Sequence, residues 1–340
     1  MKTVCVYHSI DLDGWMSAAI VKYWYSIHQR ELQDMEINAG LGIDDSDSID
    51  FLGYNYGQSI PDLSAYDKVI MCDISFPAEE MNKLIKHPNN NNFIWCDHHI
   101  SAISNPEINE NWAKGLRDTT QAACELTWKY FFPDESMPEI VRLLGRYDCF
   151  GHKGTDEEKT VLEFQYGARQ YISNYEEAYK YLIQSFNPLN PDIEDIQYAG
   201  AYIYEYLCTD AKQAYKNGFE INLSYPIKNT EVDINNIPGK NATAFEVQLV
   251  PFKFICINKE RFNPINFGID YHKDGYDGAA CFHFDGKVYN FSLYNDNGLV
   301  DCSIIAKQFG GGGHKGAAGF RCHVNDFMHI VGFWKSGTAS

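Results

Sequence analysis

Several features are scarce or missing in this sequence of 340 residues, and each absence narrows the class of protein. The ten cysteines form no C-x-x-C pair, so neither a zinc ribbon nor a dithiol redox site is indicated. No hydrophobic run reaches membrane-spanning length, and an acidic cluster interrupts the first apolar run too early for a signal peptide. These absences predict a reduced, cytoplasmic protein with no membrane partner.

Basic residues are also scarce, with 28 Lys and Arg against 46 Asp and Glu, which gives a formal net charge of -18. Proteins that bind long duplex nucleic acid use a basic surface, so the excess of acidic over basic residues argues against such a partner. A small nucleotide or short oligonucleotide fits better. Because carboxylates alone would repel a phosphate, an acidic phosphate-handling site also implies bound cations.

Apolar runs of strand length alternate with helical stretches in the first half of the chain. Residues 3–7, 68–74 and 92–96 each form an apolar run that ends near acidic or histidine residues. Helical patterns occur at 14–27, 118–132, 139–147 and 174–185. This order predicts a parallel α/β sheet, in which ligands bind beyond the carboxyl ends of the strands.

A long helix and several shorter strands are expected in the second half. The prolines of residues 187–192 break the helical period, and 193–217 then forms one connecting helix. Strand-like stretches lie at 219–223, 244–249, 254–257, 267–271, 278–284 and 287–293. The sequence therefore predicts three parts. They are an N-terminal parallel-sheet domain at 1–186, a linker and connector helix at 187–217, and a smaller mixed α/β domain at 218–340.

Two acidic clusters follow the first two predicted strands. His8, Asp11 and Asp13 lie within six residues, and Asp73 ends the strand KVIMC. Their ordinary interpretation is a polar turn and a helix cap. The alternation Asp11-Leu12-Asp13 instead favours two carboxylates aimed into one loop cavity, with the oxygen and nitrogen ligands that a hard divalent ion such as Mn²⁺ accepts.

Two further clusters strengthen the metal interpretation. Asp97, His98 and His99 follow a third apolar strand, and Asp148 ends a helical run. An isolated Asp148 is most simply a solvated surface residue. Three of the four clusters nevertheless lie at strand ends of one α/β unit, as a two-metal hydrolase requires.

A glycine-rich run near the end of the chain is the last constellation. Its glycines are Gly310, Gly311, Gly312 and Gly313, followed by His314 and Lys315. Consecutive glycines let backbone amides approach a phosphate, and the two basic side chains supply donors at its edge. A flexible linker is the alternative, but apolar flanks and the following Gly-Ala-Ala-Gly favour close packing. The run matches neither the P-loop nor the G-x-G-x-x-G signature.

In this order, the motifs resemble the DHH phosphoesterase family with a C-terminal DHHA1 domain. Asp97-His98-His99 matches the triplet that names the family, and GGGGHKGAAGF resembles the DHHA1 signature. The resemblance implies a DHH catalytic domain, a DHHA1 substrate-binding domain and two Mn²⁺ ions, with Mg²⁺ or Co²⁺ as alternatives. Substrates in the family include short oligoribonucleotides, 3′,5′-bisphosphorylated adenosine, cyclic dinucleotides, single-stranded DNA and polyphosphate.

The resemblance also implies roles for individual residues. It assigns the ligands of one ion as His8 and Asp11, those of the other as Asp13, His98 and Asp148, and the ligand between the ions as Asp73. Asp97 is then expected to orient its neighbours, His99 to contact the scissile phosphate and His314 to bind or polarise it. Gly310 to Gly313 are expected to shape the pocket.

Two departures from the family pattern affect substrate choice. The spacing from His8 to Asp11 is one residue shorter than H-x-x-x-D, and Tyr294 stands where many DHHA1 domains carry an arginine. Arg117, Lys315 and Arg321 are candidate replacements for that charge, and Tyr294 is a candidate for stacking on a base.

The sequence thus predicts a two-metal phosphoesterase that hydrolyses phosphodiester bonds of short oligonucleotides or dinucleotides through a metal-activated water. A phosphatase acting on 3′,5′-bisphosphonucleosides or polyphosphate shares every predicted ligand and remains an alternative. So does a nucleotide-binding module without turnover. Oligomeric state is not indicated by any motif.

Overall fold

The computed structural model describes residues 1–38, 47–86, 92–109, 112–187, 192–232, 244–260 and 262–332. Contacts divide the chain into two compact units, Met1–Tyr204 and Glu205–Ser340. Helix α8, Asp192–Lys216, contains the boundary between them. The domain limits expected from the sequence stay a prediction. In the part of the chain that is described, no helix is both long and apolar enough to cross a membrane.

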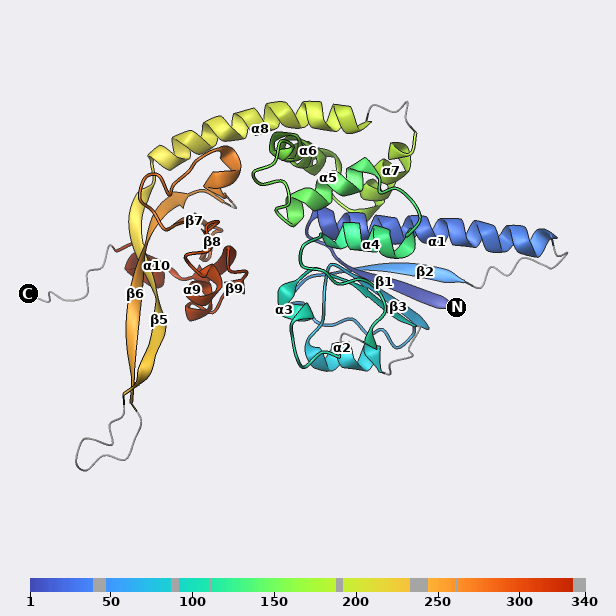
Figure 1. Cartoon of the computed structure of the whole chain (residues 1–340), viewed down its shortest axis with the longest axis horizontal. Helices are drawn as coiled ribbons and strands as arrows, with labels where there is room; N and C mark the ends of the chain where they lie inside the picture. The colour runs from blue at the N-terminus through green and yellow to red at the C-terminus, as the bar shows by residue number, and fades with distance from the viewer. Residues whose placement is uncertain are drawn as a thin grey trace, which may run out of the picture. The chain divides into compact units, whose positions relative to one another are not determined.

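A four-stranded parallel sheet forms the centre of the N-terminal unit (Figure 1). Its strands are β1 (Lys2–His8), β2 (Ser48–Tyr54), β3 (Lys68–Cys72) and β4 (Phe93–Cys96), in the order β2-β1-β3-β4. All three neighbouring pairs run parallel, so the carboxyl ends of the strands meet at one edge. That edge is where the predicted metal ligands follow β1, β3 and β4.

Successive side chains of each strand point to opposite faces of the sheet, and helices pack against both faces. On one face, Val6, Met71 and Trp95 belong to a buried cluster that includes Met81 of α2 (Ala78–Ile85). On the other face, residues such as Cys72 pack with side chains of α1 (Leu12–Asn38) and α4 (Ala123–Phe131). The sheet is therefore covered on both faces, as Figure 1 shows for α1 and α2.

Three further helices of this unit build a second core. They are α5 (Glu139–Asp148), α6 (Glu158–Tyr171) and α7 (Tyr175–Ser185), whereas the short helix α3 (Ile100–Ile103) adds Ala102 to the cluster that contains Met81. One buried cluster joins Met16 of α1, Trp128 of α4, Leu144 of α5 and Phe164 of α6. This packing fixes α5, whose last residue is the predicted ligand Asp148.

The C-terminal unit contains a mixed six-stranded sheet in the order β5-β6-β7-β8-β10-β9. Its strands are β5 (Phe219–Val232), β6 (Ala244–Asn258), β7 (Gly278–Phe284), β8 (Tyr289–Tyr294), β9 (Gly312–Gly313) and β10 (Ala317–Cys322). Helices α9 (Cys302–Gln308) and α10 (Val324–Ile330) contribute to the buried cluster on one face. The predicted α/β class, with a parallel N-terminal sheet and a mixed C-terminal sheet, is confirmed.

An expected strand and an expected helix start were wrong, each for a local reason. The expected strand at 267–271 is absent, because Pro264–Phe267 forms a 3-10 helix that ends at Gly268 with a positive φ of 72°. The helix expected from residue 118 begins at Ala123, because the Asp118 carboxylate accepts the Thr120 amide and closes a turn.

Candidate metal centre

The junction of β1 and α1 brings the first predicted ligands together. His8 ends β1, and Asp11 immediately precedes α1, where its Oδ1 accepts the Gly14 amide at 3.1 Å. A Cβ on Gly14 would lie 1.9 Å from the carbonyl oxygen of His8. A glycine is therefore required for the first turn of α1 to approach the end of β1 so closely.

Asp13 is fixed by the start of another helix. Its Oδ2 accepts the amide of Ala123 at 2.9 Å, and its Oδ1 accepts the amide of Cys124 at 2.7 Å. Ala123 begins α4, whose N-terminal amides carry partial positive charge and have no partner within the helix. The helix end thereby holds a buried carboxylate in one orientation, with Oδ2 3.7 Å from His98 Nε2.

Asp73 lies at the centre of the cluster in an unusual backbone conformation. It follows β3 with a φ of 60° and is 1% exposed. Its Oδ2 lies 3.4 Å from His8 Nδ1, and its Oδ1 lies 3.3 Å from His98 Nε2. A non-glycine residue with positive φ stores backbone strain, and such strain clusters at functional sites. The two carboxylate oxygens thus face two different histidines.

Asp97 is fully buried and organises the residues that follow β4. Its Oδ1 accepts the amides of His98 and His99 at 2.8 and 3.1 Å and lies 2.8 Å from His99 Nδ1. Its Oδ2 accepts the indole N–H of Trp95 at 3.1 Å. One carboxylate therefore sets both the backbone turn and the orientation of the His99 ring.

Asp148 reaches the same cluster from the end of α5, with Oδ2 3.3 Å from His98 Nε2. A neighbouring ion pair was not predicted from the sequence. Nη2 of Arg146 donates to both carboxylate oxygens of Glu125, at 2.6 and 2.8 Å, and Glu125 is 3% exposed. This pair joins α4 to the last turn of α5, so it supports the helix end that carries Asp148.

The described residues form three overlapping groups able to hold a metal ion. The groups are His8, Asp11 and Asp73; Asp13, His98 and Asp148; and Asp73, His98 and His99. In each group, the candidate ligand atoms all lie within 4.8 Å of one another. His8 Nδ1 and Asp73 Oδ1 are buried without a hydrogen-bond partner among the described residues. Donors of this kind fit hard or borderline divalent ions.

Electrostatic shifts reflect the crowding of charge in this site. Burial, followed by like charges, raises the pKa of Asp13 and of Asp148 to about 7. Burial lowers the pKa of His8 and His98, but adjacent carboxylates outweigh it and raise the values to about 10 and about 11. Without a cation, the cluster therefore retains protons at neutral pH, and a bound divalent ion would have to displace them.

Arg117, a predicted substrate-binding residue, contacts the protein backbone. Its guanidinium donates to the backbone carbonyls of Trp95, Lys114 and Ala113, at 2.9, 3.2 and 2.9 Å, and lies over the Trp95 ring. These contacts attach the segment after α3 to β4. A substrate role for Arg117 stays a prediction.

The other predicted substrate residues belong to the C-terminal unit. Gly310, Gly311 and Arg321 line a hollow of about 540 Å³. His314 and Lys315 lie in the turn between β9 and β10, where the Lys315 carbonyl accepts the Cys302 amide at 2.9 Å. Gly312 and Gly313 form β9, and Tyr294 ends β8 opposite Ala317 of β10. The structure thus brings Gly310 and Gly311 to one hollow with Arg321, and the roles of all these residues remain predictions.

Tyr56 is a residue that sequence analysis did not identify. It lies in the turn after β2, with its ring centroid 6.0 Å from that of His8 and 6.1 Å from that of His99. Although 53% of the residue is exposed, desolvation of its hydroxyl end beside Ser75, and then the charge of Asp97, raises the pKa of the phenol to about 12, so the hydroxyl is neutral at physiological pH. No motif marks this tyrosine, because β2 itself was not predicted.

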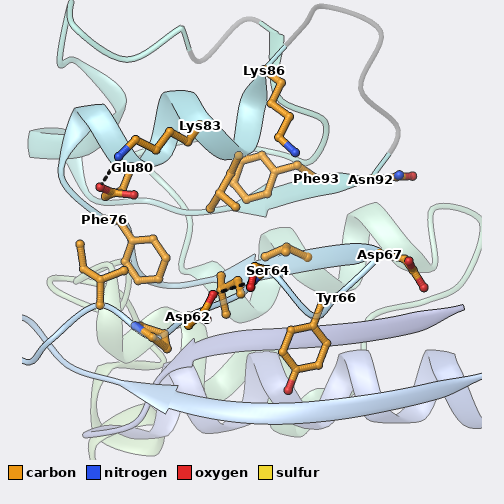
Figure 2. A pocket seen from close by; sticks show the side chains of 15 residues that line it. Asp62, Ser64, Tyr66, Asp67, Phe76, Glu80, Lys83, Lys86, Asn92 and Phe93 are labelled. Atoms are coloured by element: carbon orange, nitrogen blue, oxygen red, sulfur yellow. Dashed lines mark hydrogen bonds and ion pairs between the residues drawn. The ribbon is translucent and has the colours of Figure 1, made fainter.

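A separate hollow of about 580 Å³ lies in the N-terminal unit (Figure 2). The side chains of Phe76 and Phe93 line it, with Lys83 and Lys86 from the region of α2 and Asp62 from the segment before β3. None of its lining residues is a predicted site residue. The metal centre is therefore distinct from this hollow.

Comparisons with known proteins give distant likenesses. No family model matches the sequence. An uncharacterized protein of Acanthamoeba polyphaga mimivirus is 25% identical over 333 residues, which cover 93% of this chain and 66% of that relative. The chain therefore spans just under two thirds of the relative's length.

Two solved structures are similar over most of their length. One is a pGpG-specific phosphodiesterase from Vibrio cholerae, with 14% identity, a TM-score of 0.49, and coverage of 97% of this chain and 96% of that structure. The other is an exopolyphosphatase-related protein from Bacteroides fragilis, with 14% identity, a TM-score of 0.43, and coverage of 98% and 92%. With such low sequence identities and TM-scores, these structures indicate no reaction for this chain. Any inference about catalysis therefore rests on the chain's own residues. The chain is similar to DHH-domain phosphoesterases in two respects, which are the His98-His99 motif beside Asp73 and the α/β architecture.

Proposed function

We propose that this chain is a two-metal phosphoesterase acting on short oligonucleotides or dinucleotides. The observation that carries the proposal is the position of Asp73. One of its oxygens faces His8 at 3.4 Å, and the other faces His98 at 3.3 Å. A carboxylate shared by two ligand groups is the arrangement expected between two closely spaced divalent ions.

The ligands of the first ion are proposed to be His8, Asp11 and Asp73, and those of the second Asp13, His98, Asp148 and the shared Asp73. When bound, such ions supply Lewis-acid neutralisation of phosphate charge and lower the pKa of a coordinated water. Mn²⁺ is the proposed metal, because the groups combine imidazoles with carboxylates and contain no thiolate. Mg²⁺ and Co²⁺ are alternatives for the same ligands.

His99 and Asp97 are proposed to act together on the phosphate. Because Asp97 accepts both backbone amides and lies beside His99 Nδ1, it fixes the ring and leaves Nε2 as the atom that presents a proton outward. A carboxylate next to an imidazole also favours the protonated ring, and the pKa of His99 is raised by Asp97 despite the lowering effect of burial. A charged donor fits a phosphate oxygen.

Substrate binding is proposed for the C-terminal unit, through His314, Lys315, Tyr294, Arg321 and the glycines Gly310 to Gly313. The hollow beside Gly310, Gly311 and Arg321 supports this proposal. The formal net charge of -18 supports a short substrate over a long one, since a long strand would add repelling phosphates.

The test is a product assay of the purified chain with Mn²⁺. It compares an RNA dinucleotide, a longer RNA, 3′,5′-bisphosphoadenosine, polyphosphate and pGpG, the substrate named for one of the similar structures. We expect mononucleotides, released fastest from the shortest RNA. Inorganic phosphate alone would identify a phosphatase, and no product despite bound Mn²⁺ would leave a binding module.

The proposed binding of two metal ions through Asp73 can be tested separately, with a matched control variant. Asp73→Ala is expected to abolish metal-dependent hydrolysis and to lower bound Mn²⁺, measured by elemental analysis, from two ions per chain. Asp134→Ala removes an exposed carboxylate of a turn and should leave both unchanged. Full activity in Asp73→Ala would remove the shared-ligand role.

A further inference from the structure

Tyr56 presents an aromatic ring at the edge of the metal centre. Although its ring lies about as far from His8 as from His99, at 6.0 and 6.1 Å between centroids, 53% of the residue is exposed. A buried tyrosine at this position would serve packing. An exposed one leaves ring surface for contact with a molecule that approaches the two histidines.

Hydrogen bonds fix the turn that carries this ring. Asn55 Oδ1 accepts the amide of Ser9 at 3.2 Å, and Gln58 Oε1 accepts the amide of Asn55 at 3.0 Å. The Tyr56 hydroxyl lies 3.4 Å from Ser75 Oγ, within hydrogen-bond distance. Ser9 adjoins His8, and Ser75 follows Asp73 by two residues. These hydrogen bonds hold the ring beside the segments that carry the predicted ligands, so the ring is preorganised for binding.

Other exposed apolar side chains adjoin the ligands. Ile10, Ile100 and Phe150 are 52%, 54% and 51% exposed, and each lies within two residues of a predicted ligand or of His99. Single exposed apolar residues need no explanation by themselves. Their shared closeness in sequence to the residues of the proposed phosphate site matters, because inorganic phosphate and polyphosphate offer no apolar surface, whereas a nucleoside does.

We propose that Tyr56 is a specificity-determining residue on which the nucleobase next to the scissile phosphate stacks. The inference rests on the proposed function and deepens it, because it assigns nucleoside-bearing phosphates over inorganic polyphosphate. Base–aromatic stacking tolerates all four bases, since each has a π face. Tyr56 therefore selects for the presence of a base and not for its identity.

The experiment measures how much the base contributes to binding. Equilibrium binding of AMP and of ribose 5-phosphate to the full chain is compared in Mn²⁺ buffer by calorimetry. Wild type is expected to bind AMP about 10- to 100-fold more tightly. Tyr56→Ala should bring this ratio close to one, whereas Tyr56→Phe, which keeps the ring, should preserve it. Tyr206→Ala, which removes an exposed tyrosine of α8, is the matched control and should also preserve it.

Two outcomes overturn the inference: a wild-type ratio near one, or a ratio that survives in Tyr56→Ala. Should Tyr56→Ala unfold, Tyr56→Leu replaces it, because leucine keeps apolar bulk but lacks the aromatic face. The ratio is a binding measurement and requires no hydrolysis. A chain that fails every product assay but loses its AMP preference in Tyr56→Ala would disprove the proposed function and support the role of Tyr56.

Discussion

Asp97 illustrates how one buried residue can control a site without holding a metal. Its carboxylate accepts three backbone or indole N–H groups and faces His99 Nδ1. We predict that Asp97→Ala lowers kcat/KM about 10- to 100-fold, because the His99 ring loses its fixed orientation. Bound Mn²⁺ should stay near two ions per chain, since Asp97 belongs to none of the ligand groups.

Steady-state kinetics and elemental analysis on one preparation check this prediction. Asp134→Ala, which removes an exposed carboxylate of a turn, is the control. Unchanged kcat/KM in Asp97→Ala would contradict the positioning role, and loss of both ions would make Asp97 part of the metal site itself. Thermal unfolding must show that the variant is folded at the assay temperature.

The sequence was informative about single residues wherever chemistry follows a strand. His8, Asp73 and His98 follow three apolar runs, so their meeting at one sheet edge could be expected. The contacts of Tyr56 and of the Glu125–Arg146 pair could not, because they depend on how β2, α4 and α5 pack. The φ of 60° at Asp73 is likewise a product of tertiary structure, since aspartate appears in ordinary turns as well.

At the scale of elements, adjacent glycines of the C-terminal run differ sharply in their surroundings. A Cβ on Gly311 would lie 2.1 Å from the Gly319 carbonyl oxygen, whereas a Cβ on Gly312 would have nothing within 4 Å. We therefore predict that Gly311→Ala destabilises the chain by about 1–3 kcal/mol, because β10 must shift. Gly312→Ala should change stability by less than about 0.5 kcal/mol.

Urea unfolding of the two variants tests this pair, and each serves as the control for the other. Equal destabilisation would show that the run is sensitive to any side chain and would contradict the close-approach explanation. Loss of substrate affinity in Gly312→Ala with unchanged stability would instead point to contact with a ligand at that glycine.

In the N-terminal unit, the strands that were predicted correctly are those whose side chains are buried on both faces of the sheet. β1, β3 and β4 are continuous apolar runs, because both of their faces are covered. β2 was not predicted, since it lies at the sheet edge, is half-exposed along most of its length and has the mixed sequence SIDFLGY. The separate strands expected at 244–249 and 254–257 are one strand, β6, through Pro251. The pairing of β6 with β7 covers Phe254–Asn258, so on that side Pro251 interrupts no described pair.

At the scale of the whole molecule, we expect stability to depend on cations, because the candidate metal centre gathers buried acidic side chains. A metal that binds the folded chain but not the unfolded chain stabilises it by about 2.7 kcal/mol at a concentration 100 times its Kd. The effect should depend on pH, because Asp13 and Asp148 have pKa values raised to about 7, and His8 and His98 have values near 10 and 11. All four hold protons more tightly in the metal-free fold than isolated side chains do.

We therefore predict that Mn²⁺ raises the apparent Tm more at pH 8 than at pH 6. Each proton that the ion displaces weakens binding about tenfold per unit of falling pH, as long as the pH is below the pKa of that group. Scanning calorimetry with Mn²⁺ or EDTA at both pH values checks the sign. Asp134→Ala should behave like wild type and Asp73→Ala should lose most of the shift. A shift that is equal at both pH values would mean that the ion displaces no protons, and the ligand set of buried carboxylates and imidazoles would then be wrong.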